Sequence, residues 1–314
     1  MGVVASELVA ARTEKLFYYS PYAGLRALDK ARQQELFGTG RALLFTSLPD
    51  QHVFDVEAPS GLIQFLYKFL AWDTDFFGAP TYKLFTVLYA PSVRLEELTE
   101  AAQVFESQFY HYEKFYCFAE LPTEDNKLLQ ALTRAGWRLV ESRLTYFYDA
   151  VSTFQHVRYP IRSVRKTEAA HIGEIASSAR NEYDRFHADS WFGAVTADNF
   201  LAHYASATVL GYCDEVLVPD EAELPLDSFL AISDLEADAA NLGCGLSRVV
   251  LTAVGSANRG WHLKLVAETI QRAQQFDKQY VLMTTQATNR AVFRTCEKLG
   301  FKLGGCSQVI ACSK

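Results

Sequence analysis

The segment from Tyr280 to Phe301 constrains the fold most, because it carries an apolar strand into an amphipathic helix with a defined start and stop. The residues YVLMTTQ predict a buried strand over 280–286. Asn289 is typical of a helix N-cap, and Gly300 is typical of the left-handed residue that ends a helix. The upstream segment 249–270, VVLTAVGSANRGWHLKLVAETI, predicts a second strand, an Arg-Gly turn and a second amphipathic helix. These patterns indicate an α/β fold.

The first half of the chain follows the same order of elements. If Asp125 is placed on Asn289, Gly136 falls on Gly300, with helices of equal length between them. We predict two tandem α/β halves, with domains at residues 1–155 and 156–314. The alternative is that the likeness does not indicate a duplication, because any two strand-helix-strand units look alike. The first-half elements are a strand at 81–89, a helix at 95–109, a strand at 115–121, a helix at 126–136 and a strand at 138–149.

Composition is typical of a soluble cytoplasmic enzyme. The chain has 314 residues, 49% of them hydrophobic, which is enough for a substantial core. A net charge of −7 argues against general nucleic-acid binding, and neither a membrane span nor a signal peptide is apparent. The six cysteines lack CxxC spacing, so we expect buried or free thiols and no metal.

Together these segments resemble the GNAT superfamily of acyl-CoA-dependent N-acyltransferases. The order strand, Arg-Gly turn, helix, strand, Asn-capped helix and Gly-Phe carries the resemblance. The segments LAWDTDFFG (70–78), ARNEYDRFHAD (179–189) and TTQATN (284–289) are similar to the bacterial branch that acetylates dTDP-linked amino sugars, such as dTDP-fucosamine acetyltransferases. The resemblance implies two GNAT-like halves with mixed, mostly antiparallel central sheets flanked by helices.

The resemblance also places acetyl-CoA in the second half. GNAT proteins hold the coenzyme pyrophosphate on backbone N–H groups at a helix N-terminus, which favours an anion. The turn 255–260 offers glycines for this purpose, whereas the first-half turn at 90–94 has none and contains Pro91. We therefore expect residues 1–155 to form a degenerate scaffold domain. The implied coenzyme-binding residues are Ala253, Val254, Gly255, Asn258, Arg259, Gly260, Trp261, His262 and Asn289.

Two positions depart from the family pattern. The glycines three and five residues after Arg259 are replaced by His262 and Lys264, either of which could add charge near the phosphates or be a solvated side chain. The tyrosine that protonates the leaving thiolate in many members is replaced by Cys296. We expect Cys296 to be a weak proton donor, or dispensable because solvent protonates the thiolate. Covalent acyl transfer through Cys296 is a rarer alternative.

The acceptor is expected to meet residues from the two sugar-branch segments. Asp184 and His187 are predicted as catalytic together with Cys296, with one carboxylate serving the attacking amine directly or through water. Each residue also has a structural alternative, as a cap, a core histidine or a salt-bridge partner. The predicted substrate-binding residues are Asp73, Asp75, Phe77, Tyr183, Arg185 and Asp189.

The implied activity is transfer of acetyl from acetyl-CoA to the amino group of a dTDP-linked 3- or 4-amino-dideoxy sugar, by direct attack in a ternary complex, for surface polysaccharide biosynthesis. No nucleic-acid or membrane partner is expected, and a homodimer is left open. The alternatives are a non-catalytic acyl-CoA-binding protein of the same fold, an acyltransferase for a peptide or protein amine, and an aminoacyl-tRNA-dependent peptide ligase. The acidic charge balance argues against the last of these.

Overall fold

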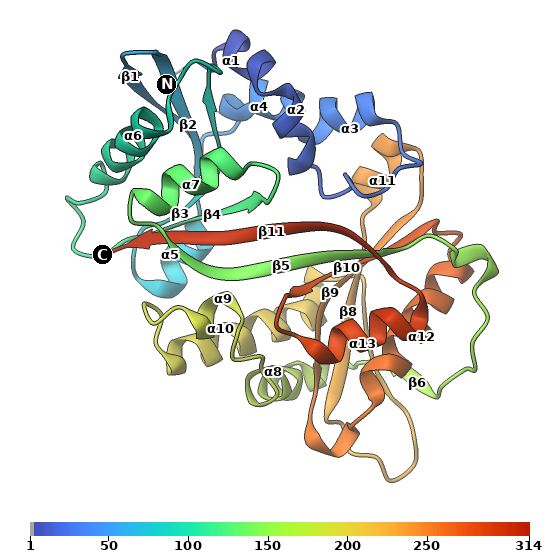
Figure 1. Cartoon of the computed structure of the whole chain (residues 1–314). Helices are drawn as coiled ribbons and strands as arrows, with labels where there is room; N and C mark the ends of the chain where they lie inside the picture. Colours follow the sequence, from blue (N-terminus) through green and yellow to red (C-terminus); the bar gives the residue numbers. More distant parts are fainter. Residues whose placement is uncertain (1–2) are drawn as a thin grey trace. The chain divides into compact units, whose positions relative to one another are not determined.

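The computed structural model describes residues 3–314 and divides the chain into two compact units (Figure 1). Unit 1 extends to Arg143 and also contains the last ten residues, Gly305–Lys314. Unit 2 comprises Leu144–Gly304. The compact units therefore differ from the halves drawn at residue 155, because the C-terminal end of the chain packs with unit 1.

Unit 1 is built on a mixed sheet in the order β1-β2-β3-β4-β11, in which β3 and β4 are parallel and the other neighbours antiparallel. Helices α6 and α7 pack on one face of this sheet through Phe105 and Leu128, and the N-terminal helices pack on strand residues of the other face such as Phe85. The helices of unit 1 are α1 (Ser6–Ala11), α2 (Thr13–Leu16), α3 (Lys30–Phe37), α4 (Thr39–Leu43), α5 (Ala71–Phe77), α6 (Leu95–Ser107) and α7 (Asn126–Arg134), with 3₁₀ turns η1 (Phe17–Tyr19) and η2 (Phe45–Ser47). The strands are β1 (Gln51–Ala58), β2 (Gly61–Phe69), β3 (Thr81–Tyr89), β4 (Tyr116–Pro122) and the parts of β5 (Arg138–Tyr148) and β11 (Lys302–Ser313) that belong to this unit.

Unit 2 repeats this architecture with the order β10-β9-β8-β7-β6, in which β9 and β10 are parallel and the other neighbours antiparallel. Helices α12 and α13 cover one face, and α8 and α10 cover the other. The helices are α8 (Ala169–Ser178), α9 (Arg185–Ala188), α10 (Ala194–Ala207), α11 (Glu236–Leu242), α12 (Trp261–Gln275) and α13 (Arg290–Leu299), with 3₁₀ turns η3 (Val151–Thr153), η4 (Lys166–Glu168) and η6 (Ser256–Asn258) and a π-helical turn η5 (Thr208–Tyr212). The strands are β6 (Ile161–Ser163), β7 (Glu215–Pro219), β8 (Ser228–Asp234), β9 (Leu246–Val254), β10 (Tyr280–Gln286) and the remaining parts of β5 and β11.

The two units share details of register that go beyond a common order of elements. The parallel pair extends over four residues in each unit, Thr81–Leu84 of β3 and Leu246–Val249 of β9. The register to the antiparallel neighbour then shifts by one residue, at Phe85 in β3 and at Val250 in β9. A bulge at the same place in both nine-residue strands bends each of them away from its parallel partner. The predicted tandem α/β fold is confirmed.

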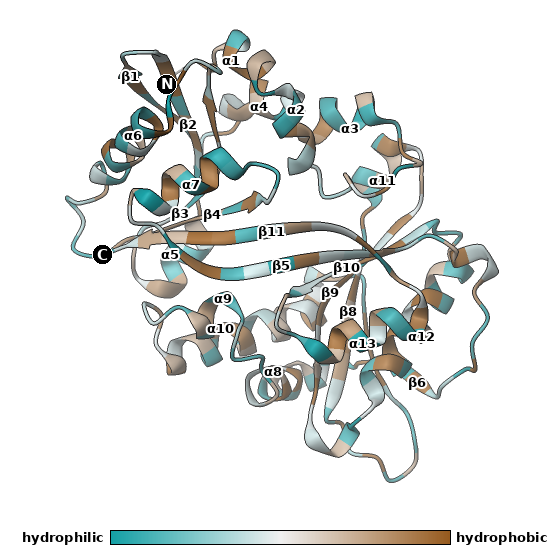
Figure 2. Cartoon of the chain, in the orientation of Figure 1, coloured by the Kyte–Doolittle hydropathy of each residue, from teal (hydrophilic) through white to brown (hydrophobic). Residues whose placement is uncertain are grey.

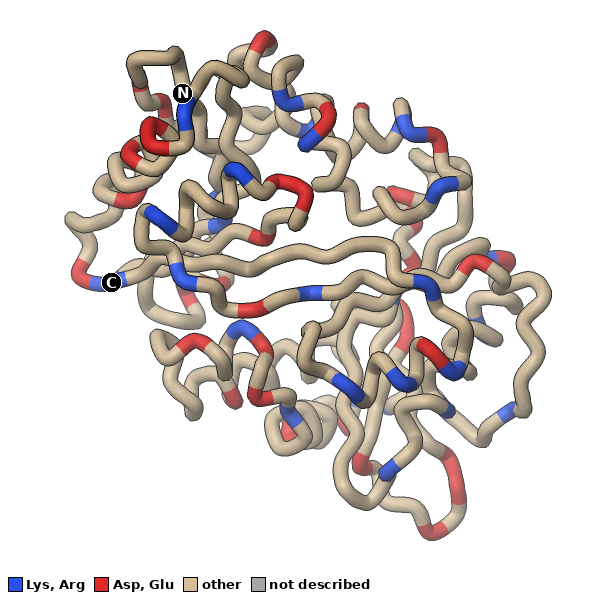
Figure 3. Tube along the Cα trace, viewed as in Figure 1, with Lys and Arg blue, Asp and Glu red and all other residues tan. Residues whose placement is uncertain are grey.

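Hydrophobic residues follow the strands and the sheet-facing sides of the helices (Figure 2). Charges of both signs are interspersed along both units (Figure 3). In the part of the chain that the structure describes, no helix is long and apolar enough to span a membrane.

Candidate coenzyme site

The two parallel strands of unit 2 diverge beyond their fourth pair. β9 stays paired with β8 up to Val254, while its pairing with β10 ends at Val249. Alternate backbone groups of a strand point to opposite neighbours. The second half of β9, including Ala253 and Val254, therefore presents N–H and C=O groups toward the side from which β10 has departed, where an extended ligand with amide groups can pair with them.

The turn after β9 is fixed by an aspartate that sequence reasoning missed. Asp227 accepts hydrogen bonds from the N–H of Gly255 at its carbonyl oxygen, 2.7 Å, and from the N–H of Ala257 at Oδ2, 2.9 Å. A Cβ at Gly255 would lie 2.0 Å from Oδ1 of Asp227, so glycine is required there by this carboxylate. Asn258 is buried, and its Nδ2 donates to the Pro225 carbonyl and to Ser228 Oγ. Gly255 and Asn258 thus fix the conformation of the turn.

The turn ends at a helix N-terminus that none of the described residues caps. Gly260 has a φ of +94° and directs the chain into the fifteen-residue helix α12. Among the described residues, no acceptor meets the backbone N–H groups of Trp261, His262 and Leu263. The exposed side chain of Arg259 has no ion-pair partner in residues 3–314. Three free N–H groups, the positive end of the helix dipole and a free guanidinium form a site for an anion such as a pyrophosphate.

His262 points away from this anion site and carries no charge near neutrality. Its Nδ1 lies 2.8 Å from the hydroxyl of Thr295 on α13, which itself donates to the Ala291 carbonyl, so Nδ1 is the donor. Burial lowers the pKa of His262 to about 4. The expectation that His262 adds positive charge near the phosphates is therefore not met. Lys264 Nζ is engaged as well, 3.2 Å from Glu221 and over the Trp261 ring.

The corresponding helix start in unit 1 differs in charge. The first turn of α6 carries Glu96 and Glu97, whereas the first turn of α12 carries no acidic residue. The buried Glu97 carboxylate accepts from the N–H of Arg94 at 2.7 Å and from the hydroxyl of Ser60 at 3.0 Å. Because carboxylates already stand at the start of α6, an anionic ligand is less favourable there than at the start of α12.

Comparison with known proteins identifies the fold. No protein-family model matches the sequence, and no curated protein matches it. A GCN5-related N-acetyltransferase (GNAT) from Sphaerobacter thermophilus is similar in structure, with a TM-score of 0.59 at 13% identity over 99% of this chain and 94% of that one. The chain has the GNAT fold.

Two further structures resemble it. A functionally unknown conserved protein from Staphylococcus epidermidis ATCC 12228 has a TM-score of 0.54 at 13% identity, covering 85% of this chain and 96% of that one. A tandem GNAT protein from the clavulanic acid biosynthesis pathway has a TM-score of 0.49 at 14% identity, covering 100% and 97%.

The GNAT fold of unit 2 brings the predicted acceptor segment to the carboxyl end of β10. Asn181 Nδ2 donates to the side-chain oxygen of Gln286, the last residue of β10, at 2.9 Å. Tyr183 follows this contact, and its side chain is 59% exposed. The loop that carries the predicted acceptor residues thus starts at the edge where the two parallel strands diverge.

Asp184 and His187 hold this segment together. Asp184 caps α9 by accepting from the N–H groups of Phe186 and His187, and its Oδ2 lies 2.7 Å from His187 Nδ1. His187 Nε2 lies 3.0 Å from Asp198, which also pairs with Arg180. Both ring nitrogens are therefore engaged by carboxylates. A catalytic role for either residue stays a prediction.

The remaining substrate predictions fall on short local structures. Arg185 is stacked over the Phe186 ring at 4.3 Å, and Asp189 Oδ1 accepts from the N–H of Trp191. In unit 1, the predicted residues Asp73, Asp75 and Phe77 all lie on α5. Their part in substrate binding stays a prediction.

Two predictions on α13 concern its cap and its thiol. Asn289 Oδ1 accepts from the N–H of Val292, which confirms the predicted N-cap, and Gly300 ends the helix with a φ of +81°. Cys296 lies on α13 and is fully buried in the core that α12 and α13 form with the sheet. Burial raises the pKa of this thiol to about 12. A thiol this weakly acidic is a poor proton donor to a thiolate, so the structure favours the alternative in which Cys296 is dispensable.

Proposed function

We propose that this protein is an N-acetyltransferase that binds acetyl-CoA in unit 2 and transfers the acetyl group to an amine. The observation that carries the proposal is the uncapped N-terminus of α12 beside strands that diverge after four pairs. The start of α12 supplies N–H donors for an anion. Beside it, where β10 has diverged from β9, an extended chain with amide groups can pair with β9.

The residues present fit the coenzyme. The N–H groups at Trp261, His262 and Leu263, with Arg259, would hold the pyrophosphate. The free backbone groups near Ala253 and Val254 would pair with the pantetheine amides and supply a donor for the carbonyl oxygen as it gains charge. Acetyl-CoA itself supplies an activated thioester, so the protein has to position the amine, hold the oxyanion and accept a proton from the amine.

The proton acceptor we favour is a water molecule relayed to a carboxylate. Asp184 and His187 are each engaged by hydrogen bonds, with each other and, for His187, with Asp198 on α10, and Cys296 is buried in the core. A relay requires none of these three to leave its present position. Solvent would then protonate the leaving thiolate.

The acceptor we propose is a dTDP-linked 3- or 4-amino-dideoxy sugar. This rests on the similarity of the segments 70–78, 179–189 and 284–289 to the sugar N-acetyltransferases. The exposed ring of Tyr183 and the link from Asn181 to the end of β10 support an acceptor that approaches from the 179–189 segment.

The coenzyme site is tested with two variants at glycines of positive φ, one at the site and one away from it. Gly260 and Gly243 both have positive φ, and an added side chain meets nothing within 4 Å at either. Gly260→Val should weaken acetyl-CoA binding by calorimetry at least about tenfold, which is about 1.4 kcal/mol. Gly243→Val, at the end of α11, should bind normally. Equal affinities for acetyl-CoA in the two folded variants would contradict the assignment of the coenzyme site.

The reaction is tested separately with acetyl-CoA and a panel of amines. Release of free thiol with a dTDP-amino sugar, and a lower kcat/KM in Tyr183→Ala with unchanged acetyl-CoA affinity, would support the sugar assignment. Faster acetylation of peptide amines than of amino sugars would make peptide amines the proposed acceptor. Coenzyme binding without transfer to any amine would support the non-catalytic alternative.

A further inference from the structure

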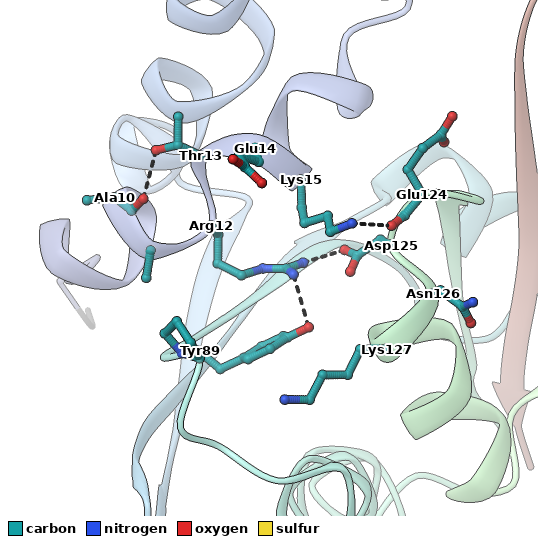
Figure 4. Close-up of a pocket in the computed structure, with 12 residues that line it drawn as sticks. Ala10, Arg12, Thr13, Glu14, Lys15, Tyr89, Glu124, Asp125, Asn126 and Lys127 are labelled. Carbon is teal, nitrogen blue, oxygen red and sulfur yellow. Dashed lines mark hydrogen bonds and ion pairs between the residues drawn. The ribbon is translucent and has the colours of Figure 1, made fainter.

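A cavity lies in unit 1, where β3 and β4 diverge (Figure 4). It has a volume of about 550 Å³ and is lined by the segment 10–15, the end of β3 and the start of α7. By the register of the two units, the end of β3 corresponds to the end of β9 in unit 2, and α7 corresponds to α13. Nothing proposed above uses it.

The chain itself fills the inner end of this cavity. The Arg12 guanidinium forms an ion pair with Oδ2 of Asp125 and donates to the Tyr89 hydroxyl at 3.0 Å (Figure 4). The Tyr19 hydroxyl donates to the same Asp125 oxygen at 2.6 Å. Arg12 is 5% exposed and Asp125 is 1% exposed. A ligand as long as coenzyme A therefore cannot take the path it would take in unit 2, and the space that remains suits a smaller molecule.

Several donors at the cavity have no acceptor. The Asp125 side chain turns to Arg12 and does not cap α7, so the N–H groups of Asn126, Lys127 and Leu128 meet no acceptor among the described residues. Within residues 3–314, the buried Nε of Arg12 also lacks a partner. Uncapped N–H groups at the start of a nine-residue helix call for an anionic group. The Lys127 ammonium already donates to the Val93 carbonyl and lies over the Tyr89 ring, but it adds positive charge to the lining.

One acceptor at the cavity has no donor. Oδ1 of Asp125 is buried and receives no hydrogen bond from the described part of the chain, although Oδ2 of the same carboxylate receives two. A buried carboxylate oxygen without a donor is costly, and a cationic or hydrogen-bonding ligand group removes that cost. The other charged lining residues are balanced, with Lys15 and Lys127 against Glu14 and Glu124. A polyanion such as a nucleotide gains nothing from such a lining.

We propose that this cavity binds a small zwitterion, an α-amino acid or a similar compound with a carboxylate and an ammonium a few bonds apart. The carboxylate lies at the N-terminus of α7 beside Lys127, and the ammonium donates to Oδ1 of Asp125. A simple anion leaves the aspartate oxygen without a donor, and a simple amine leaves the helix without an acceptor. Only a ligand with both groups completes the site. None of the residues proposed above for acetyl transfer lines this cavity, so we assign it as an accessory site.

The test is calorimetry on the full-length protein with each standard L-amino acid, and with acetate and methylamine as probes of the single charges. At least one amino acid should bind, and at least about tenfold more tightly than either probe. Ala11→Trp fills the cavity mouth from an exposed position and should lower that affinity at least about tenfold. Ser6→Trp, exposed on the same helix and outside the lining, should leave it unchanged.

Three outcomes would overturn the proposal. One is that no amino acid binds the wild-type protein. Another is that acetate or methylamine binds as tightly as the best amino acid. The last is that a folded Ala11→Trp variant keeps full affinity. None of them bears on acetyl-CoA binding in unit 2, so the two proposals fail or stand separately.

Discussion

At the scale of single residues, the environment of a side chain decides its chemistry more than its identity does. Cys296 stands where the sequence resemblance to GNAT proteins led us to expect a tyrosine, but its thiol is buried and its pKa is raised to about 12. Cys296→Ala should keep the rate of acetyl transfer within a few-fold of wild type, because solvent protonates the thiolate in either protein. It should cost about 1 kcal/mol of stability for the lost packing. A fall in kcat of a hundredfold or more, measured in a folded variant, would restore a catalytic role.

The lowered pKa of His262 predicts how the stability of the folded protein depends on pH. Its pKa falls from an ordinary 6.5 to about 4 on folding, so between these values the unfolded chain binds more protons than the folded one. Stability should therefore decline as the pH falls from 6.5 toward 4, by an amount on the order of 3 kcal/mol for this residue. Urea unfolding across this range should show a weaker decline in His262→Leu. The same slope in both proteins would contradict the assignment.

At the scale of elements, the turn before α12 depends on one carboxylate that anchors it. Asp227→Ala removes the acceptor for the Ala257 N–H and frees the turn, so acetyl-CoA should bind about tenfold more weakly. Stability should fall by only about 1 kcal/mol, the usual effect of one hydrogen bond. Asp214→Ala is the matched control, since Asp214 accepts from the N–H of Asp234 in the same way but away from the turn. Calorimetry on both variants should separate them, and equal affinities would show that the anchor is irrelevant to the coenzyme.

At the scale of the whole molecule, the C-terminal ten residues tie the end of the chain to unit 1. The segment 307–313 of β11 pairs with β4 in seven antiparallel positions, and the side chains of Val309 to Cys312 are buried there. A chain truncated after Gly304 should expose β4 as an unpaired edge and destabilise unit 1. Hydrogen exchange should then lose protection in β3 and β4 first. Protection of β4 equal to that in the full-length protein would contradict this account.

The sequence by itself determined the local elements and their order. The strand at 280–286, the cap at Asn289, the stop at Gly300 and the first-half strand at 81–89 all lie where the patterns predict them. These features depend on residues a few positions apart, since apolar periodicity and capping act within one or two turns. For the same reason the uncapped start of α12 was predictable from the Arg259-Gly260 turn.

The tertiary structure alone decided which partner each polar group meets. Asp227 reaches the 255–257 turn from a loop 30 residues away, and Arg12 closes the unit 1 cavity by pairing with a residue 113 positions away. The tertiary structure also places His262 in contact with Thr295 and pairs β11 with β4. No local pattern encodes such pairings, because they follow from how separate elements pack. Burial then fixed the pKa of His262 and of Cys296, which no sequence position reveals without its surroundings.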